Sequence, residues 1–201
     1  MSNKTTTSNK LVVKDLVTIG IFSLLFIVFT FLITCLQVTP LLSFTTPPLA
    51  ALVVGPIFLL FIARTQKPLC ITIMGIIISL LVGFFIYGHV LIALFNFVFF
   101  ILAELIARTG GYKKLKTNFI SYIVLSFWSF GEIGGYWVAQ DWMMQKALAS
   151  NLEADFFTQI YSMANLSTFL IIFASTIICA ILSCLLAKAM FKKHFIKSGI
   201  A

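Results

Sequence analysis

Six long apolar runs dominate this chain of 201 residues and restrict its fold more than any other feature of the sequence. A bilayer's hydrocarbon core is about 30 Å thick and takes about 20 residues of helix to cross, and only helices or closed barrels satisfy their backbone there. The runs lack the apolar–polar alternation of barrel strands, so they predict helices. The expected crossings are residues 16–36, 49–63, 69–87, 89–107, 119–138 and 166–190.

The composition agrees with a chain embedded in a membrane. Hydrophobic residues make up 61% of it, charged residues make up 10%, and the mean hydropathy is +1.09. These values are too apolar for a soluble domain. We predict an all-α, polytopic protein in which residues 1–201 form a single domain, a bundle of six transmembrane helices.

The second apolar run is short for a crossing and is rich in proline. It contains Pro56, and Pro47 and Pro48 come just before it. Proline removes a backbone donor inside a helix but is tolerated in the first turn. The second helix is therefore expected to begin upstream, near Phe44, or to be kinked.

The lysines and arginines fall on one side of the six crossings. The two ends of the chain and the turns after the second and fourth runs hold all but one of the 14, and Lys146 is the exception. The positive-inside rule then predicts cytoplasmic termini, with residues 1–13 and 191–201 as tails. The formal charge of +8 follows from topology and attraction to anionic lipid, so no nucleic acid partner is expected.

Neither a cleaved leader nor a metal site is predicted. The first run exceeds the apolar core of a signal peptide, about 7–15 residues, and no A-x-A site follows it. The cysteines lie within the runs without ligand-like spacing, so they are expected to be packing residues. They are Cys35, Cys70, Cys179 and Cys184. No cofactor is expected.

Two longer connections lie on the side opposite the cations. One is residues 37–48, rich in Thr and Pro, and the other is residues 139–165, which is long enough to be a lid, a binding loop or a surface helix. Apolar residues recur within the second at approximately helical spacing, which indicates an amphipathic segment at the outer interface. They are Trp142, Leu148, Leu152, Phe156 and Ile160. A lid and a helix resting on lipid are both open interpretations.

Charged residues within the runs need a partner or a polar cavity, since each costs about 3 kcal/mol on insertion scales. Glu104 and Arg108 have the i, i+4 spacing of an ion pair on one helix, and we interpret that pair as structural. Glu132 shares its run with no cation and lies roughly 20 Å above the run's cytoplasmic start at 1.5 Å per residue. It is therefore the leading candidate for a site.

The surroundings of Glu132 in a regular helix suggest a binding cavity. Trp128, Glu132, Gly135 and Tyr136 would share one face, which places a carboxylate between aromatic rings beside a glycine. Aromatic walls with a few polar groups suit a small polar ring compound. The alternative is a protonated carboxyl that forms a hydrogen bond between helices.

The fourth run supplies two further candidates for this cavity. His89 and Asn96 share one face and could converge with Glu132. Equally, His89 could lie at the water line, and Asn96 could form an interhelical hydrogen bond. Trp137, Gln140 and Asp141 would then lie at the mouth, where tryptophan is usually an interface anchor. No catalytic motif is present, so no enzyme activity is expected.

Several segments of the sequence resemble the Trep_Strep family of bacterial integral membrane proteins. They are residues 14–22, Met74-Gly75, residues 103–108 with the basic Gly-Tyr segment that follows, and the ending, residues 192–200. The family is similar in size and plan to the substrate-binding S components of energy-coupling factor (ECF) transporters. The resemblance implies a six-helix protein that captures a vitamin-like solute outside the cell. Its partners would be a transmembrane coupling subunit and two cytoplasmic ATPases.

The resemblance also implies a docking surface on the first helix. Many S components use an Ala-x-x-x-Ala motif there, because small residues permit close approach of helices. This chain lacks the motif, and Gly20 and Ser23 are the nearest equivalent. We expect the coupling subunit to dock at this pair, and ordinary packing within the bundle is the alternative.

Three functions remain open at this stage. The first is an S component in the cell membrane, with Glu132, Trp128, Tyr136, Asn96 and His89 around the solute. The second is a self-sufficient secondary permease coupled to protons through Glu132. The third is a membrane enzyme or assembly factor, which only the long outer segment supports.

Overall fold

The computed structural model describes residues 11–86, 88–149 and 154–194, and within these residues the regular elements are all helices, without a strand. The all-α prediction is confirmed. Among the described residues, four helices are long and apolar enough to cross a bilayer. They are α1 (Val13–Thr34), α3 (Thr46–Thr65), α5 (Val90–Thr109) and α11 (Leu166–His194), of which Leu166–Phe191 is the apolar part.

The remaining predicted crossings take less regular forms. The third is α4 (Cys70–Ile78), which continues as a π-helix, η1 (Ser79–Ile86). The fifth, expected as one helix, is broken into α6 (Leu115–Leu125), the 3-10 helix η2 (Ser126–Ser129), α7 (Phe130–Ile133) and α8 (Gly135–Val138). A continuous fifth helix is therefore wrong, and the count of six crossings stays a prediction.

The second long helix begins upstream of the apolar run, as the prolines predict. It starts at Thr46, and Pro47 and Pro48 occupy its first turn, where a missing N–H leaves no bond unmade. Pro56 lies inside the same helix. The last helix continues to His194, so the predicted tail from residue 191 begins in helix.

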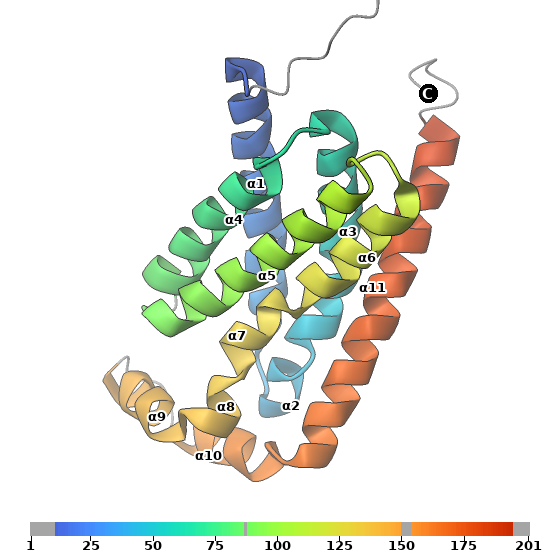
Figure 1. The fold of residues 1–201 in the computed structure, drawn as a ribbon. Helices are drawn as coiled ribbons and strands as arrows, with labels where there is room; N and C mark the ends of the chain where they lie inside the picture. Colours follow the sequence, from blue (N-terminus) through green and yellow to red (C-terminus); the bar gives the residue numbers. More distant parts are fainter. Residues whose placement is uncertain (1–10, 87, 150–153, 195–201) are drawn as a thin grey trace, which may run out of the picture.

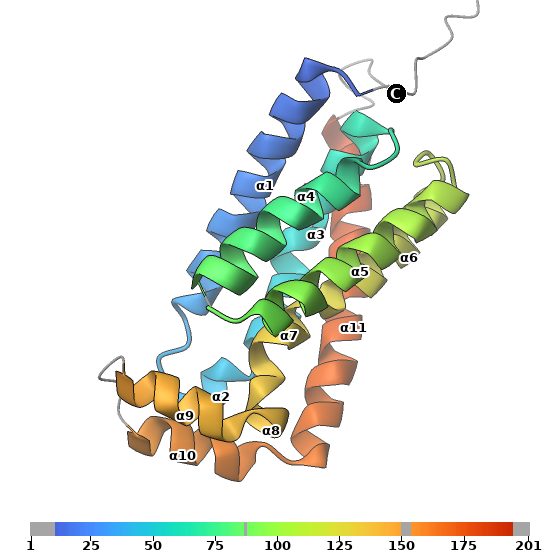
Figure 2. The ribbon, with the colours of Figure 1, turned by 60° about the vertical axis from the view of Figure 1, so that its left-hand side comes forward.

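The two ends of the bundle differ in the elements that form them. The start of α1, the α3–α4 and α5–α6 connections and the end of α11 lie together, and we call this the basic end (Figure 1, Figure 2). At the opposite, capped end lie α2 (Pro40–Ser43), α9 (Gln140–Ala149) and α10 (Ala154–Met163). In Figure 2, α9 and α10 run across the ends of the long helices.

This arrangement gathers the described cations as the charge count predicts. Arg64 and Lys67, Arg108, and Lys113 to Lys116 all belong to the connections of the basic end or their flanks. An even number of crossings would place α1's start and α11's end together in this way. Which side of the membrane they face stays a prediction. Lys4, Lys10 and Lys197 lie outside the described residues, as do the side chains of Lys146, Lys192 and Lys193.

Two clusters of buried side chains fill the bundle. The inner core packs α1, α3, α4, α5, α6 and α11 around large side chains such as Phe26, Phe58 and Trp128. The outer core lies toward the capped end and contains Phe44, Ile133, Tyr136 and Ile160. The second cluster ties the broken fifth segment to α2 and α10, so the capped end is packed onto the bundle.

A glycine lets three helices of the inner core approach closely. A Cβ on Gly55 of α3 would overlap the Ser183 hydroxyl of α11 and come within 2.6 Å of the Tyr122 ring of α6. Both neighbours donate hydrogen bonds to α3 carbonyls, Tyr122 to Ala51 (2.6 Å) and Ser183 to Leu52 (2.7 Å). The centre of the bundle is therefore fixed by polar contacts as well as by apolar packing.

Candidate functional site

The broken fifth segment has a local cause in its sequence. Gly131, Gly134 and Gly135 weaken the helix, since glycine is about 1 kcal/mol less favourable than alanine in a helix interior. The Ser126 and Ser129 hydroxyls donate to carbonyls three residues earlier, at 2.7 and 3.1 Å, which competes with regular helical bonding. The segment therefore narrows to a 3-10 turn before Glu132 and breaks after it.

Glu132 lies in the short helix α7 and borders a cavity of about 60 Å³. The cavity is formed by the last turns of α1, by the π-helix η1 and by Glu132 itself, which is 3% exposed. Thr30 and Thr34 of α1 and Val82 and Ile86 of η1 are among its lining residues. The predicted site carboxylate is thus buried beside a cavity, but its neighbours there come from α1 and η1.

The two aromatic rings predicted to flank Glu132 belong to different clusters. Trp128 is 2% exposed and packs on Phe26 in the inner core, with ring centroids 5.1 Å apart. Tyr136 packs edge-on against Phe44 at 5.7 Å in the outer core. Neither of them lines the Glu132 cavity.

Asn96 joins α5 to the broken segment. It is fully buried, and with its amide nitrogen directed at the acceptors it donates to the carbonyls of Trp128 (2.8 Å) and Ile92 (3.1 Å). A Cβ on Gly131 would overlap the end of the Asn96 amide group, so glycine lets the two segments meet. Asn96 therefore forms an interhelical hydrogen bond. This was the alternative to its contact with a ligand.

His89 lies at the start of α5, apart from the cavity's lining residues. Its Nδ1 accepts a hydrogen bond from the Leu91 N–H at 3.2 Å, which caps the helix. Its ring lies edge-on to Trp142 of α9, with ring centroids 4.4 Å apart. His89 therefore connects α5 to the capping helices.

The described part of the outer segment, residues 139–165, is largely helical, with contacts between its two helices and to the end of the broken segment. Met143 of α9 occupies the space beside Gly135, where an added Cβ would meet its sulfur at 2.5 Å. The Tyr161 hydroxyl of α10 donates to the Gln140 carbonyl (3.0 Å), and the Trp137 indole donates to the Asn165 carbonyl (3.3 Å). The glycine expected to leave room for a ligand instead leaves room for a side chain of α9.

The predicted amphipathic pattern of this segment holds only in its second half. Ile160 of α10 is fully buried and Phe156 is half-buried, whereas Leu148 of α9 is 55% exposed. Leu152 lies outside the described residues. The pattern therefore runs through two separate helices in place of one continuous face.

The small residues predicted for docking face different ways. Gly20 is exposed and an added Cβ there would meet nothing within 4 Å, whereas Ser23 is 1% exposed. Three residues of helix turn the chain by about 300°, so the two side chains diverge by about 60°. Ser23 is inside the bundle, and only Gly20 belongs to the exposed face of α1.

A second buried carboxylate, Glu104, fixes the basic end. It accepts hydrogen bonds from the N–H groups of Leu69 (3.0 Å), Ile71 (3.0 Å) and Thr72 (3.3 Å), and a short one from the Tyr112 hydroxyl. Glu104 therefore caps α4 from another helix, where a negative charge also complements the helix dipole. The predicted pair with Arg108 is wrong, because the carboxylate faces these donors instead.

The residues that Glu104 holds are in an uncommon backbone conformation. Leu69 and Tyr112 have φ values of 68° and 61°, in the left-handed region that side chains disfavour. Burial, reinforced by the Glu104 hydrogen bond and charge, raises the pKa of Tyr112 well above its usual value, so its hydroxyl stays a donor. One carboxylate thus stabilises two connections of the basic end.

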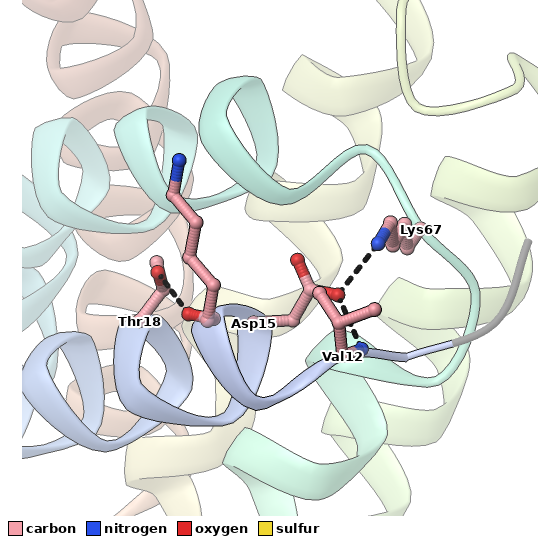
Figure 3. A network of polar contacts seen from close by, with 5 residues as sticks. Val12, Asp15, Thr18 and Lys67 are labelled. Atoms are coloured by element: carbon pink, nitrogen blue, oxygen red, sulfur yellow. Dashed lines mark hydrogen bonds and ion pairs between the residues drawn. The ribbon is translucent and has the colours of Figure 1, made fainter. Parts of the chain in front are cut away.

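An ion pair ties the start of α1 to the same end (Figure 3). Lys67 Nζ lies 2.6 Å from Asp15 Oδ2, and the same oxygen accepts a hydrogen bond from the Val12 N–H at 2.9 Å. Sequence analysis missed this pair because its members are in different segments. The α3–α4 connection is therefore held from both sides, by α5 and by α1.

A wide apolar groove lies over the broken segment, between α5 and α11. Its volume is about 730 Å³, and no charged side chain lines it. Aromatic residues from several elements form its walls, which is why no single run of the sequence indicates it. They include Phe95, Phe99, Phe127, Phe130, Trp137 and Phe173.

Long apolar helices and a charged end define the class of protein, a helical integral membrane protein. The chain belongs to the Trep_Strep family, described as hypothetical bacterial integral membrane proteins, whose family model matches residues 13–197. No curated protein and no solved structure matches it. The family resemblance predicted from the sequence is thereby confirmed.

Proposed function

We propose that this chain is a substrate-binding subunit, an S component, of an ECF-type importer in the bacterial cell membrane. It captures a vitamin or related small solute from outside and passes it inward, without catalysing a reaction. A transmembrane coupling subunit and two cytoplasmic ATPases supply the energy. The single observation that carries this proposal is the buried Glu132 carboxylate beside a cavity near the capped end.

The architecture of the capped end supports capture from that side. The cavity lies between the last turns of α1, the end of η1 and α7, and α9 and α10 extend across this end of the bundle (Figure 2). A buried carboxylate in a membrane segment is expensive and usually functional. A π-helix, rare in proteins and frequent at functional sites, forms one wall.

Under this proposal, only one of the predicted site residues contacts the solute, and the others have structural roles. Glu132 contacts the solute directly, whereas Trp128, Asn96 and Tyr136 hold the broken segment in place. His89 connects the capping helices through Trp142. Gly20, on the open face of α1, marks the docking surface for the coupling subunit.

Native mass spectrometry of the gently purified protein tests the proposal. The expected result is a retained small molecule, together with ATPase and coupling subunits in part of the population. Solute uptake should stop when the ATPase genes are deleted. Uptake that continues without them would contradict the importer and favour a proton-coupled permease, for which Glu132 would carry the proton.

A further inference from the structure

The residues that line the Glu132 cavity restrict the chemical class of solute that it can bind. Of its seven lining residues, Glu132 is the charged one, and Thr30 and Thr34 are the polar neutral ones. The other walls are hydrocarbon, from Ile27, Phe31, Val82 and Ile86. The cavity is therefore apolar, with one carboxyl group and two hydroxyls in its walls.

The Thr30 hydroxyl in the cavity wall is buried and could form a hydrogen bond with a ligand. Thr30 is 3% exposed, and its hydroxyl makes no hydrogen bond within the described part of the chain. Buried hydroxyls are nearly always paired, because an unpaired one costs about 1–3 kcal/mol. Thr34, one turn later, uses its hydroxyl on the Thr30 carbonyl at 3.1 Å. Thr30 thus has hydrogen-bonding capacity left beside the carboxylate.

The size of the cavity limits what can enter it. Its volume is about 60 Å³. Whole ligands usually occupy roughly 300–1,000 Å³. The cavity therefore fits one terminal group of a solute, of a few heavy atoms.

We propose that the cavity between α1, η1 and α7 binds a protonated amine at the end of an aliphatic stem, with Glu132 pairing the ammonium and Thr30 accepting a second N–H. This inference rests on the proposed function and narrows its solute to organic amines. A carboxylate removed from water stabilises a cation far more strongly than it would in solvent, provided that hydrogen bonds complete the pair. The hydrocarbon walls contact the stem.

The test measures binding of propylammonium to the purified full chain by calorimetry, with 1-propanol as an uncharged probe of the same size. Saturable binding of propylammonium is expected, with 1-propanol at least about tenfold weaker, since a buried carboxylate discriminates strongly against a group that cannot pair with it. Equal binding of the two probes, or no saturable binding of propylammonium, would overturn the proposal.

Three substitutions locate the site. Glu132→Gln should weaken propylammonium binding at least about tenfold, and Thr30→Val about three- to tenfold, as expected for loss of a charged and a charge-assisted hydrogen bond. Thr18→Val is the matched control, because Thr18 lies on the same helix outside the cavity and its hydroxyl already donates to the Lys14 carbonyl at 2.8 Å, and it should change affinity less than about twofold. Wild-type affinity in both Glu132→Gln and Thr30→Val would overturn the assignment.

These measurements separate the two proposals. Amine binding is read on the isolated chain and does not need the ATPases. If uptake proves independent of ATPases while propylammonium binds through Glu132, the importer fails and the amine site stands. If ATP-driven uptake is found but Glu132→Gln binds propylammonium normally, the amine site fails and the importer stands.

Discussion

Glu104 and Glu132 are both buried carboxylates in apolar helices, yet the molecule surrounds them differently. Glu104, 5% exposed, receives three backbone N–H groups and a tyrosine hydroxyl from two other segments. Glu132, 3% exposed, borders a cavity whose other walls are hydroxyls and hydrocarbon. Burial of an acid in a membrane protein therefore does not by itself indicate function. The cavity beside Glu132 is what makes it the candidate for a binding group, whereas the donors around Glu104 identify a structural cap.

The largest expected effect is the loss of the cap at the basic end. Glu104→Ala should lower the free energy of unfolding by about 3–5 kcal/mol, because it strands buried N–H donors and the Tyr112 hydroxyl. Thermal unfolding in detergent, with circular dichroism as readout, measures it. Arg108→Ala is the control and should change stability by less than about 0.5 kcal/mol. If the two variants unfold alike, Glu104 is not the cap described.

Replacing each of the two glutamates by glutamine tests whether one is structural and the other a binding group. Glu104→Gln should still destabilise by about 2 kcal/mol, because an amide nitrogen would face N–H donors. Glu132→Gln should alter stability by less than about 1 kcal/mol, since neutralising a buried charge offsets lost contacts. Unfolding curves of the two purified variants, measured in the same detergent, test this difference in stability. Greater damage from Glu132→Gln would reverse the assignment of structural and binding roles.

The capping helices provide a smaller test of the outer region. Gly135→Leu should push Met143 away and destabilise by about 1–2 kcal/mol, as other overpacking substitutions do. Limited proteolysis should then cut within α9 faster. Gly20→Leu, at an open position of α1, is the control and should not accelerate cleavage. Unchanged cleavage in Gly135→Leu would show that Met143 does not hold α9 in place.

The smallest effect is expected from the ion pair at the basic end. Lys67→Ala should cost about 0.5–1 kcal/mol, since the two side chains are 22% and 13% exposed and partly screened by water. The difference from the unaltered protein should shrink in 1 M salt, where screening acts over about 3 Å. A salt-independent difference in unfolding temperature would mean that Lys67 acts through packing instead.

Sequence reasoning succeeded where apolar length decides the structure. It placed the long helices because a membrane crossing needs a fixed length of apolar residues, and α1 and α5 begin within three residues of the predicted starts. It failed in the fifth segment, because hydropathy does not register how Gly134 and the serine hydroxyls compete with helical bonding. The common face predicted for Trp128, Glu132 and Tyr136 assumed that same continuous helix.

The site was predicted only at its central residue. Glu132 was found because an acid in an apolar run is rare, but Thr30 and Val82 gave no comparable signal. Their approach depends on how α1 and η1 pack, which spacing along one helix cannot reveal. Glu104 was assigned to Arg108 because the i, i+4 rule considers only one helix, whereas its three backbone N–H donors lie more than 30 residues away in the chain.

The π-helix η1 gives the cavity an unusual dependence on chain length. A π-helix holds one more residue per hydrogen-bonded loop than an α-helix, so deleting a single residue from η1 would allow α-helical bonding to return. The helix beyond the deletion would keep its facing, but the wide turns of η1, which contain Val82 and Ile86, would narrow. The wall that these two residues form in the Glu132 cavity would therefore change. Family members one residue shorter in this segment should present a different wall to the same carboxylate, and differ in the solutes they accept.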